Sequence, residues 1–376
     1  MKKMAVIRGT EARPSQVYFY NYFKKLEIKF IGHKIKKSFY PPRKIAKIKY
    51  IQSPLKPAWL IDPARLIYKK VEHHAWSYHQ DLEKYIQDCE ILNLTDCFYF
   101  FCGQTARLAK KYHKPLVTIV WESFPKHPST YIPPYCFNVR AVLRESRLFI
   151  ARHRKAGIYL RSIGVPDKKI RVIYKGVDLK HFYPAEKRIG RKVKILYIGQ
   201  LAKVKGVDDL LAAFEKVCRQ EKGVELLIGG NGSLKDLVLN YAKRLPIRYL
   251  GFVSYPDLPG IYREADIFCS PSKDFLYFGF LPGGEEWFSY TLMEAMASGL
   301  PLVANRGGAV EEEVGKEGFL LEQNDVEGLA ETLLKLVRNE GLRRKMGRGS
   351  RLRAEEVFNA QKQAVKTEKA ILEIID

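Results

Sequence analysis

Short apolar runs alternate with amphipathic stretches along most of the chain, a pattern typical of parallel sheets built from strand–helix units. In the first half we expect strands at Ala5–Arg8, Glu90–Leu94, Leu116–Trp121, Arg147–Ala151 and Arg171–Tyr174, and helices at Gln104–Tyr112 and Arg154–Ile163. Between residues 30 and 90 the apolar residues follow neither a strand period nor a helix period clearly, so no element is predicted there.

The pattern is more regular in the second half, which follows a polar segment, Pro184–Gly190, that we interpret as a linker. It predicts strands at Val193–Ile198, Glu225–Ile228, Arg248–Leu250, Ile267–Ser270 and Pro301–Asn305, and helices at Val207–Arg219, Leu234–Arg244, Tyr290–Ser298, Val326–Asn339, Gly341–Val357 and Ala360–Ile375. We therefore expect an α/β protein of two Rossmann-like domains, over residues 1–183 and 184–357. A last helix, over residues 358–376, is expected to pack back on the first domain.

The composition is that of an ordinary soluble enzyme, with 46% hydrophobic and 28% charged residues. No apolar run approaches the roughly 18 residues that a membrane-spanning helix needs, and the first residues lack the apolar segment of a secretion signal. The six cysteines form no C-x-x-C pair. We therefore expect a reducing, cytoplasmic environment.

Positive charge is concentrated in the first half of the chain. Residues 1–200 carry 41 lysines and arginines against 14 acidic residues, a net charge of +27, whereas residues 201–376 carry 24 against 27, a net charge of −3. The densest stretch, Lys24–Lys49, mixes lysines with apolar side chains such as Phe30, Ile31, Phe39 and Tyr40. This mixture favours peripheral binding to the anionic inner face of the cell membrane, with nucleic-acid binding and a solvated lysine-rich loop as the alternatives.

Two loops of the second half have the composition of phosphate-binding loops. The first, Gly199–Gly206, joins a predicted strand to a helix, whose free N–H groups attract anions, and Lys205 adds a full positive charge. The second, Gly229–Ser233, follows the next strand, and its glycines on either side of Asn231 permit close approach of the backbone to a ligand. Either loop taken singly is also compatible with an ordinary turn.

Two glutamates separated by seven residues, Glu286 and Glu294, stand before and inside the helix expected at Tyr290–Ser298. The N–H groups at the start of that helix can face a diphosphate, while the carboxylates accept hydrogen bonds from sugar and ribose hydroxyls on either side. Such a pair taken singly also fits two exposed glutamates on an amphipathic helix.

Taken together, these segments resemble the family 4 retaining glycosyltransferases (glycosyl transferases group 1). That family has the GT-B architecture, in which two Rossmann-like domains have parallel sheets that face each other across a cleft. The resemblance runs from about Arg171 to Val357 and rests on the order of the motifs. These are RVIYKGVD with Phe182 and Pro184, GQLAKVKG, GGNGSL, GFV, PS, the E-x7-E pair with EAMASGLP, and NRGG followed by acidic residues.

The resemblance implies a donor site in the second domain. It assigns Lys205 to the diphosphate, Glu294 to the ribose hydroxyls, and Glu286 to the transferred sugar, where the carboxylate would stabilise positive charge at the ring. Further donor contacts are implied for Gly230, Asn231 and Gly232, for Val253 near the base, and for the backbone N–H groups of Phe288, Ser289 and Tyr290.

Two departures from the family pattern affect the chemistry. Gln200 stands where the family has an arginine, which leaves more of the cationic role to Lys205. Trp121 stands where the family often has a histidine, and its neighbour Glu122 is our candidate for an acceptor-side catalytic group.

The function implied is transfer of a sugar, with retained configuration, from a UDP-, GDP- or ADP-sugar to an acceptor hydroxyl. The basic first half favours an acceptor that is lipid-linked or at the membrane surface. The chain has no D-x-D motif and the family is metal-independent, so no metal cofactor is expected. A sugar-nucleotide epimerase of the same fold and a non-catalytic membrane- or nucleic-acid-binding protein are the alternatives; Lys205, Glu286 and Glu294 disfavour the non-catalytic one.

Overall fold

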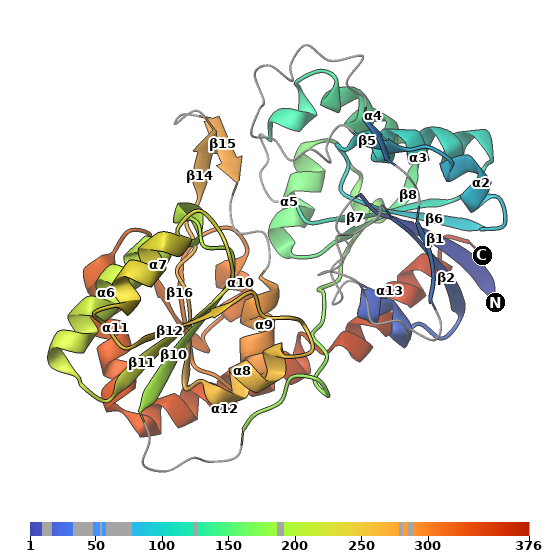
Figure 1. Ribbon diagram of the computed structural model, residues 1–376. Helices are drawn as coiled ribbons and strands as arrows, with labels where there is room; N and C mark the ends of the chain where they lie inside the picture. The colour runs from blue at the N-terminus through green and yellow to red at the C-terminus, as the bar shows by residue number, and fades with distance from the viewer. Residues whose placement is uncertain are drawn as a thin grey trace. The chain divides into compact units, whose positions relative to one another are not determined.

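The computed structural model describes residues 1–9, 17–32, 48–52, 55–57, 77–122, 127–185, 192–277, 281–284 and 289–375. The chain forms two compact units, one made of Met1–Lys175 with Gln361–Asp376 and the other of Gly176–Ala360. In Figure 1 the first unit runs from blue to green, with the red C-terminal helix, and the second runs from yellow-green to red.

The first unit is built on a seven-stranded sheet of order β3-β2-β1-β6-β7-β8-β9, in which every neighbouring pair is parallel. Its strands are β1 (Lys2–Ile7), β2 (Leu26–Gly32), β3 (Ile48–Gln52), β6 (Ile91–Thr95), β7 (Leu116–Val120), β8 (Ser146–Ala151) and β9 (Ile170–Val172). The chain moves outward from β1 to β3 and then returns to the other side of β1 with β6, so the strand order reverses between β1 and β6.

Helices cover this sheet because its strands are apolar on both faces, as the fully buried β6 and β7 show. They are α2 (Leu82–Ile86), α3 (Phe100–Lys111), α4 (Tyr135–Glu145), α5 (Arg154–Ser162) and α13 (Ala360–Leu372). A 3-10 turn, η1 (Phe19–Tyr22), and a two-stranded antiparallel pair, β4 (Leu55–Pro57) with β5 (Ser77–His79), complete the unit. Helices α3, α4 and α5 share one apolar core with β6, β7 and β8.

Strand β2 shows that part of the expectation for the lysine-rich segment was wrong. Phe30 and Ile31, which we expected at a membrane surface, are 0% exposed and belong to a strand inside the sheet. The apolar residues Leu26, Ile28 and Phe30 alternate with charged residues, which is the strand period, but the density of lysines obscured it. Residues 33–47, which contain Phe39 and Tyr40, lie outside the described residues.

One carboxylate of the C-terminal helix α13 bonds to three backbone N–H groups of the first unit. Glu368, which is 5% exposed, accepts hydrogen bonds from the backbone N–H groups of Lys24 at 3.0 Å, Lys25 at 2.7 Å and Leu26 at 2.9 Å. These N–H groups belong to the first residue of β2 and the two residues before it. The carboxylate thereby accepts from one buried and two partly buried donors and links α13 to β2.

The second unit has a six-stranded sheet of order β12-β11-β10-β13-β16-β17, again parallel at every pair. Its strands are β10 (Val193–Ile198), β11 (Val224–Gly229), β12 (Ile247–Gly251), β13 (Ile267–Ser270), β16 (Leu302–Asn305) and β17 (Gly318–Leu321). The strand order reverses between β10 and β13, as it does between β1 and β6 in the first unit.

Helices also cover both faces of the second sheet, and a hairpin interrupts the chain after β13. The helices are α6 (Val207–Gln220), α7 (Lys235–Ala242), α8 (Leu258–Glu264), α9 (Tyr290–Ala297), α10 (Val310–Val314), α11 (Val326–Arg338) and α12 (Glu340–Glu356). The hairpin, β14 (Phe275–Tyr277) with β15 (Leu281–Gly284), stands out from the body of this unit in Figure 1. The two sheets confirm the expected α/β fold of two Rossmann-like domains.

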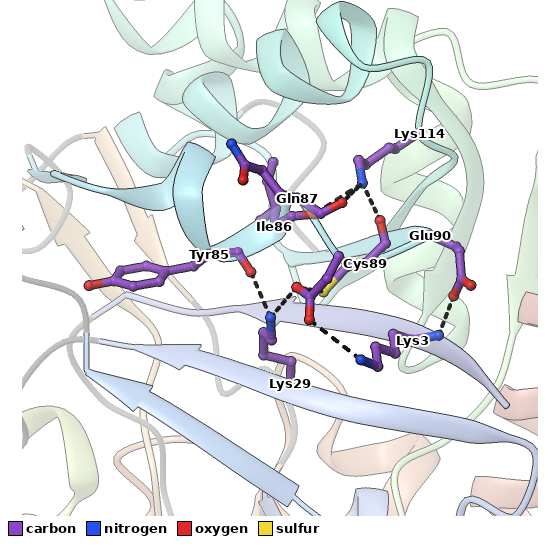
Figure 2. Close-up of polar contacts among 9 residues, drawn as sticks. Lys3, Lys29, Tyr85, Ile86, Gln87, Cys89, Glu90 and Lys114 are labelled. Atoms are coloured by element: carbon purple, nitrogen blue, oxygen red, sulfur yellow. Dashed lines mark hydrogen bonds and ion pairs between the residues drawn. The ribbon is translucent and has the colours of Figure 1, made fainter.

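At the amino ends of β1, β2 and β6, lysines hold the short segment that follows α2 (Figure 2). Lys114 donates to the backbone carbonyls of Ile86 at 3.0 Å and Gln87 at 2.9 Å, and also to that of Cys89. Lys29 donates to the carbonyl of Tyr85 at 3.1 Å. These carbonyls lie at the end of a five-residue helix, where intrahelical partners are lacking, so the ammonium groups satisfy them.

Replacing Lys114 by alanine should therefore lower the unfolding free energy of the first unit by about 2 kcal/mol, because it removes the donor from the partly buried carbonyls of Ile86 and Cys89. A urea titration that follows this unit measures the change. The matched control is Lys110→Ala, an exposed lysine of α3, for which a change below about 0.5 kcal/mol is expected. Equal stability losses in the two variants would contradict the role given to Lys114.

Candidate functional site

The expected donor-site residues gather at the carboxyl edge of the second sheet, on both sides of the point where its strand order reverses. In open α/β sheets such a point opens a crevice between diverging loops, and ligands bind there. Lys205 ends the 3-10 turn η6 (Lys203–Lys205) in the loop after β10, and its side chain is half-buried. The loop after the neighbouring strand β13 begins with Pro271.

These two loops are packed against each other through a glycine. Gly206 has a φ of 65°, and a Cβ atom at this position would lie only 1.9 Å from the carbonyl oxygen of Pro271. The Lys273 N–H donates to the carbonyl of Val204 at 2.8 Å, which adds a second link. Only glycine fits this contact, so Gly206 fixes the position of its neighbour Lys205.

The glycine-rich loop after β11 packs in the same way on the loop after β10. A Cβ atom on Gly230 would lie 1.8 Å from the carbonyl oxygen of Gly199, and one on Gly232 would lie 2.3 Å from that of Leu201. These glycines therefore serve the contact between loops, whatever they also do for a ligand. Asn231 is exposed, and its Oδ1 accepts a hydrogen bond from the Tyr249 hydroxyl at 2.7 Å.

Val253 follows β12 at the same edge and is half-buried. Its Cγ2 lies 3.1 Å from the position that a Cβ on Gly229 would take, so it borders the glycine-rich loop. Gln200 is exposed in the loop after β10.

Helix α9 begins at the same edge and carries the second expected glutamate. Ser289 caps the helix: its Oγ accepts a hydrogen bond from the Leu292 backbone nitrogen, 3.4 Å away. The N–H of Ser289, which we expected to face a phosphate, donates to Oε2 of Glu313 at 2.9 Å. Tyr290 is the first helical residue and is half-buried. Glu286 and Phe288 lie outside the described residues, so their roles stay predictions.

Glu294 lies inside α9 and is 5% exposed. Its Oε2 accepts a hydrogen bond from the hydroxyl of Tyr262 at 3.0 Å. A cation on a tight loop, the amino end of a helix and a buried carboxylate thus share one edge of the sheet. This set can hold a diphosphate and a neighbouring diol.

At the carboxyl edge of the first sheet, buried polar groups gather where its strand order also reverses. Asp96 follows β6 with a φ of 60°, and its Oδ1 accepts the Trp121 N–H at 3.0 Å. Burial raises the pKa of Asp96 to about 6, against the opposing effects of the Trp121 N–H, the charge of Arg8 and the Glu122 N–H. Glu122, the acceptor-side candidate, follows β7 and is 2% exposed.

His127 is the neighbour of Glu122 that sequence reasoning missed. Its Nε2 lies 3.6 Å from Glu122 Oε2, and its ring stacks on Phe98 with centroids 5.3 Å apart. Burial lowers the pKa of His127 to about 4, so the ring is neutral at pH 7 and the contact is not an ion pair there. Nδ1 lies 2.6 Å from the Ser129 hydroxyl oxygen and 3.3 Å from the Ser129 backbone nitrogen, so Ser129 orients the ring through its Nδ1 edge.

Comparison with known proteins points to the same family as the order of the sequence motifs. Residues 180–353 match the model of the glycosyl transferases group 1. This part of the chain is a group 1 glycosyltransferase domain. Over 226 residues the chain is 33% identical to the MMP alpha-(1→4)-mannosyltransferase of Mycolicibacterium hassiacum, covering 57% of this chain and 52% of the relative.

Two further matches extend the comparison. The N-acetyl-alpha-D-glucosaminyl L-malate synthase of Bacillus anthracis is 29% identical over 209 residues, covering 52% of each chain. The chain thus spans about half the length of the curated relatives it matches. The crystal structure of HepE of Anabaena with UDP-glucose aligns with a TM-score of 0.76 over 99% of this chain and all of that chain, at 15% identity. At this identity the likeness shows the fold, which is the GT-B fold.

Two residues of this unit whose contacts were not foreseen are Tyr262 and Glu313. No element was predicted at Tyr262, and Glu313 lies in the acidic run that follows NRGG. Nothing in the local sequence pattern predicts these contacts with α9. One signal was available for Glu313: it is an acidic residue at an apolar helical position, and its side chain is 0% exposed. Among the described residues no group of three or more His, Cys, Asp or Glu side chains is placed to hold a metal ion.

The lowered pKa of His127 makes a prediction about acid stability. Between pH 6.5 and about 4 the unfolded chain protonates this histidine while the folded protein does not, so the unfolding free energy should fall as the pH drops. Relative to His127→Gln, the wild-type first unit should lose about 2 kcal/mol more between pH 7.5 and 4.5 in urea titrations. The raised pKa of Asp96 acts in the opposite direction, but it is common to both proteins.

The control for this experiment is His113→Asn, an exposed histidine of the same unit whose φ of 52° asparagine tolerates. It should keep the pH dependence of the wild-type protein. If His127→Gln also keeps it, the imidazole is protonated in the folded state and its neutrality is refuted.

Proposed function

We propose that this protein is a retaining glycosyltransferase that takes a sugar from a nucleotide diphosphate and transfers it to a hydroxyl of a lipid-linked or membrane-surface acceptor. The observation that carries the proposal is the joint placement of Lys205, the start of α9 and Glu294 at the reversal point of the second sheet. The group 1 match over residues 180–353 supports it, as does a similarly folded protein whose crystal structure contains UDP-glucose.

In this proposal each group meets a charge that develops as the glycosidic bond breaks. Negative charge gathers on the departing diphosphate, next to the ammonium of Lys205 and the amino end of α9. Glu294 holds the ribose, and Glu286 faces positive charge at the sugar ring. Attack by the acceptor hydroxyl on the same face retains the configuration. We propose that donor binding needs no metal ion, which makes EDTA a simple test of this step.

Lys205→Ala should raise the donor KM and lower kcat together, with a loss of about 2–4 kcal/mol in transition-state stabilisation, or roughly 30- to 1,000-fold in kcat/KM. Steady-state kinetics with UDP-, GDP- and ADP-sugars, in EDTA, measure the loss. The matched control is Lys203→Ala, the exposed lysine of the same 3-10 turn, which should retain activity. Unchanged kinetics in Lys205→Ala would refute the diphosphate assignment.

The membrane part of the proposal is supported by a described surface of the first unit. Along α4 the exposed side chains Phe137, Arg140 and Arg144 lie on one face, and Phe137 is 59% exposed. Tyr131, just before the helix, is 55% exposed. Aromatic and basic side chains on one helical face suit an anionic bilayer, where the arginines meet lipid phosphates and the rings enter the interface.

The protein should therefore sediment with vesicles that contain anionic lipid and not with neutral vesicles, and raised salt should release most of it. Arg140→Glu with Arg144→Glu should reduce sedimentation several-fold. The control with the same charge change is Lys345→Glu with Arg348→Glu, two exposed residues of α12 in the second unit. A wild-type protein that ignores anionic vesicles but binds RNA or DNA would refute the membrane acceptor.

A further inference from the structure

A buried tyrosine of the second unit contacts the carboxylate that we assign to the ribose. Tyr262 lies on α8 and is 0% exposed. Its ring packs between Phe182, with centroids 5.6 Å apart, and Phe268, with centroids 5.7 Å apart. The hydroxyl lies 3.0 Å from Oε2 of Glu294 and 3.3 Å from the carbonyl oxygen of Thr291.

The phenol has one proton to donate, and the carboxylate is both the closer and the charged acceptor, so the hydrogen bond goes to Glu294. Burial and the charge of Glu294 raise the pKa of Tyr262 well above its ordinary value. The hydroxyl therefore remains a donor over the whole working pH range. The two flanking aromatic rings fix its direction.

We propose that Tyr262 is a positioning residue for nucleotide recognition: by engaging Oε2 of Glu294 it directs Oε1 to the ribose hydroxyls of the donor. The inference rests on the proposed function and adds a residue of α8 to the site. A glutamate side chain has three rotatable bonds, and a carboxylate inside a protein needs donors for its oxygens. Tyr262 supplies one such donor from a neighbouring helix and so restricts the rotamers before the nucleotide arrives.

A purely structural tyrosine and a positioning tyrosine differ in one measurable respect. If Tyr262 acts through Glu294 on the ribose, removing its hydroxyl should weaken binding of a ribonucleotide but not of a nucleotide that lacks the contacted hydroxyl. If it only supports the fold, all nucleotides should lose affinity alike. The ratio of two affinities in one preparation is independent of the fraction of protein that is folded.

The experiment is isothermal titration of wild-type protein and Tyr262→Phe with UDP, 2′-deoxy-UDP and 3′-deoxy-UDP, with the GDP and ADP series used in turn if UDP does not bind. We expect Tyr262→Phe to weaken the ribonucleotide about 10-fold and to leave at least one deoxynucleotide within about twofold of wild type. In Glu294→Ala, adding Tyr262→Phe should have no further effect on ribonucleotide binding.

The control variant is Tyr20→Phe, which removes a buried hydroxyl that donates to Asn93 Oδ1 at 3.1 Å in the first unit. It should leave the ribose selectivity unchanged. A selectivity in Tyr262→Phe equal to that of wild type, or additive effects with Glu294→Ala, would overturn the positioning role alone. A wild-type protein that binds none of the three diphosphates would instead overturn the proposed function.

Discussion

Backbone-to-backbone packing at the carboxyl edge of the second sheet holds the loops on which the rest of the site depends. The backbone of Gly206 packs on that of Pro271, and the backbone of Gly230 packs on that of Gly199. Both contacts are so close that a Cβ atom on either glycine would overlap the neighbouring carbonyl oxygen. Parallel strands bring their loops to one edge, but they do not fix how the loops lie there. The glycine contacts do, and they place Lys205 at the reversal point between β10 and β13.

The first unit has a parallel sheet with the same kind of reversal in strand order, but different side chains lie at its carboxyl edge. Where the strand order of the first sheet reverses, the loops carry the buried carboxyls of Asp96 and Glu122 in place of a lysine. The two carboxyls are linked, because Asp96 accepts a hydrogen bond from the N–H of Trp121, the residue before Glu122. The ring of His127, whose pKa is lowered by burial, lies beside Glu122, with Nε2 3.6 Å from Oε2. If Glu122 has the acceptor-side role that we expect for it, a neighbour without charge leaves its carboxylate able to accept a hydrogen bond from an acceptor hydroxyl.

The sequence predicted what depends on local period and motif order. The five strands predicted for the second unit and the helix that carries Glu294 lie within a few residues of their expected positions, whereas β14, β15 and β17 were not predicted. Strand β2 was missed because its alternation of Leu26, Ile28 and Phe30 lies in a lysine-rich segment that resembled a surface. The Tyr262–Glu294 and Ser289–Glu313 contacts join residues 32 and 24 positions apart, and no periodicity encodes such pairings.

Side chains from neighbouring helices contact α9 at its amino end and at Glu294, which bears on the proposed binding of a diphosphate. Glu313 of α10 engages the N–H of Ser289, so that amide is already satisfied by a carboxylate. Position 200 is a glutamine, so the cation that the related family has there is missing. In the proposed site both features reduce the attraction for phosphate, the first at the amino end of α9 and the second in the loop after β10. The proposed function therefore gives the ammonium of Lys205 a larger share of the stabilisation than in a site with an additional arginine.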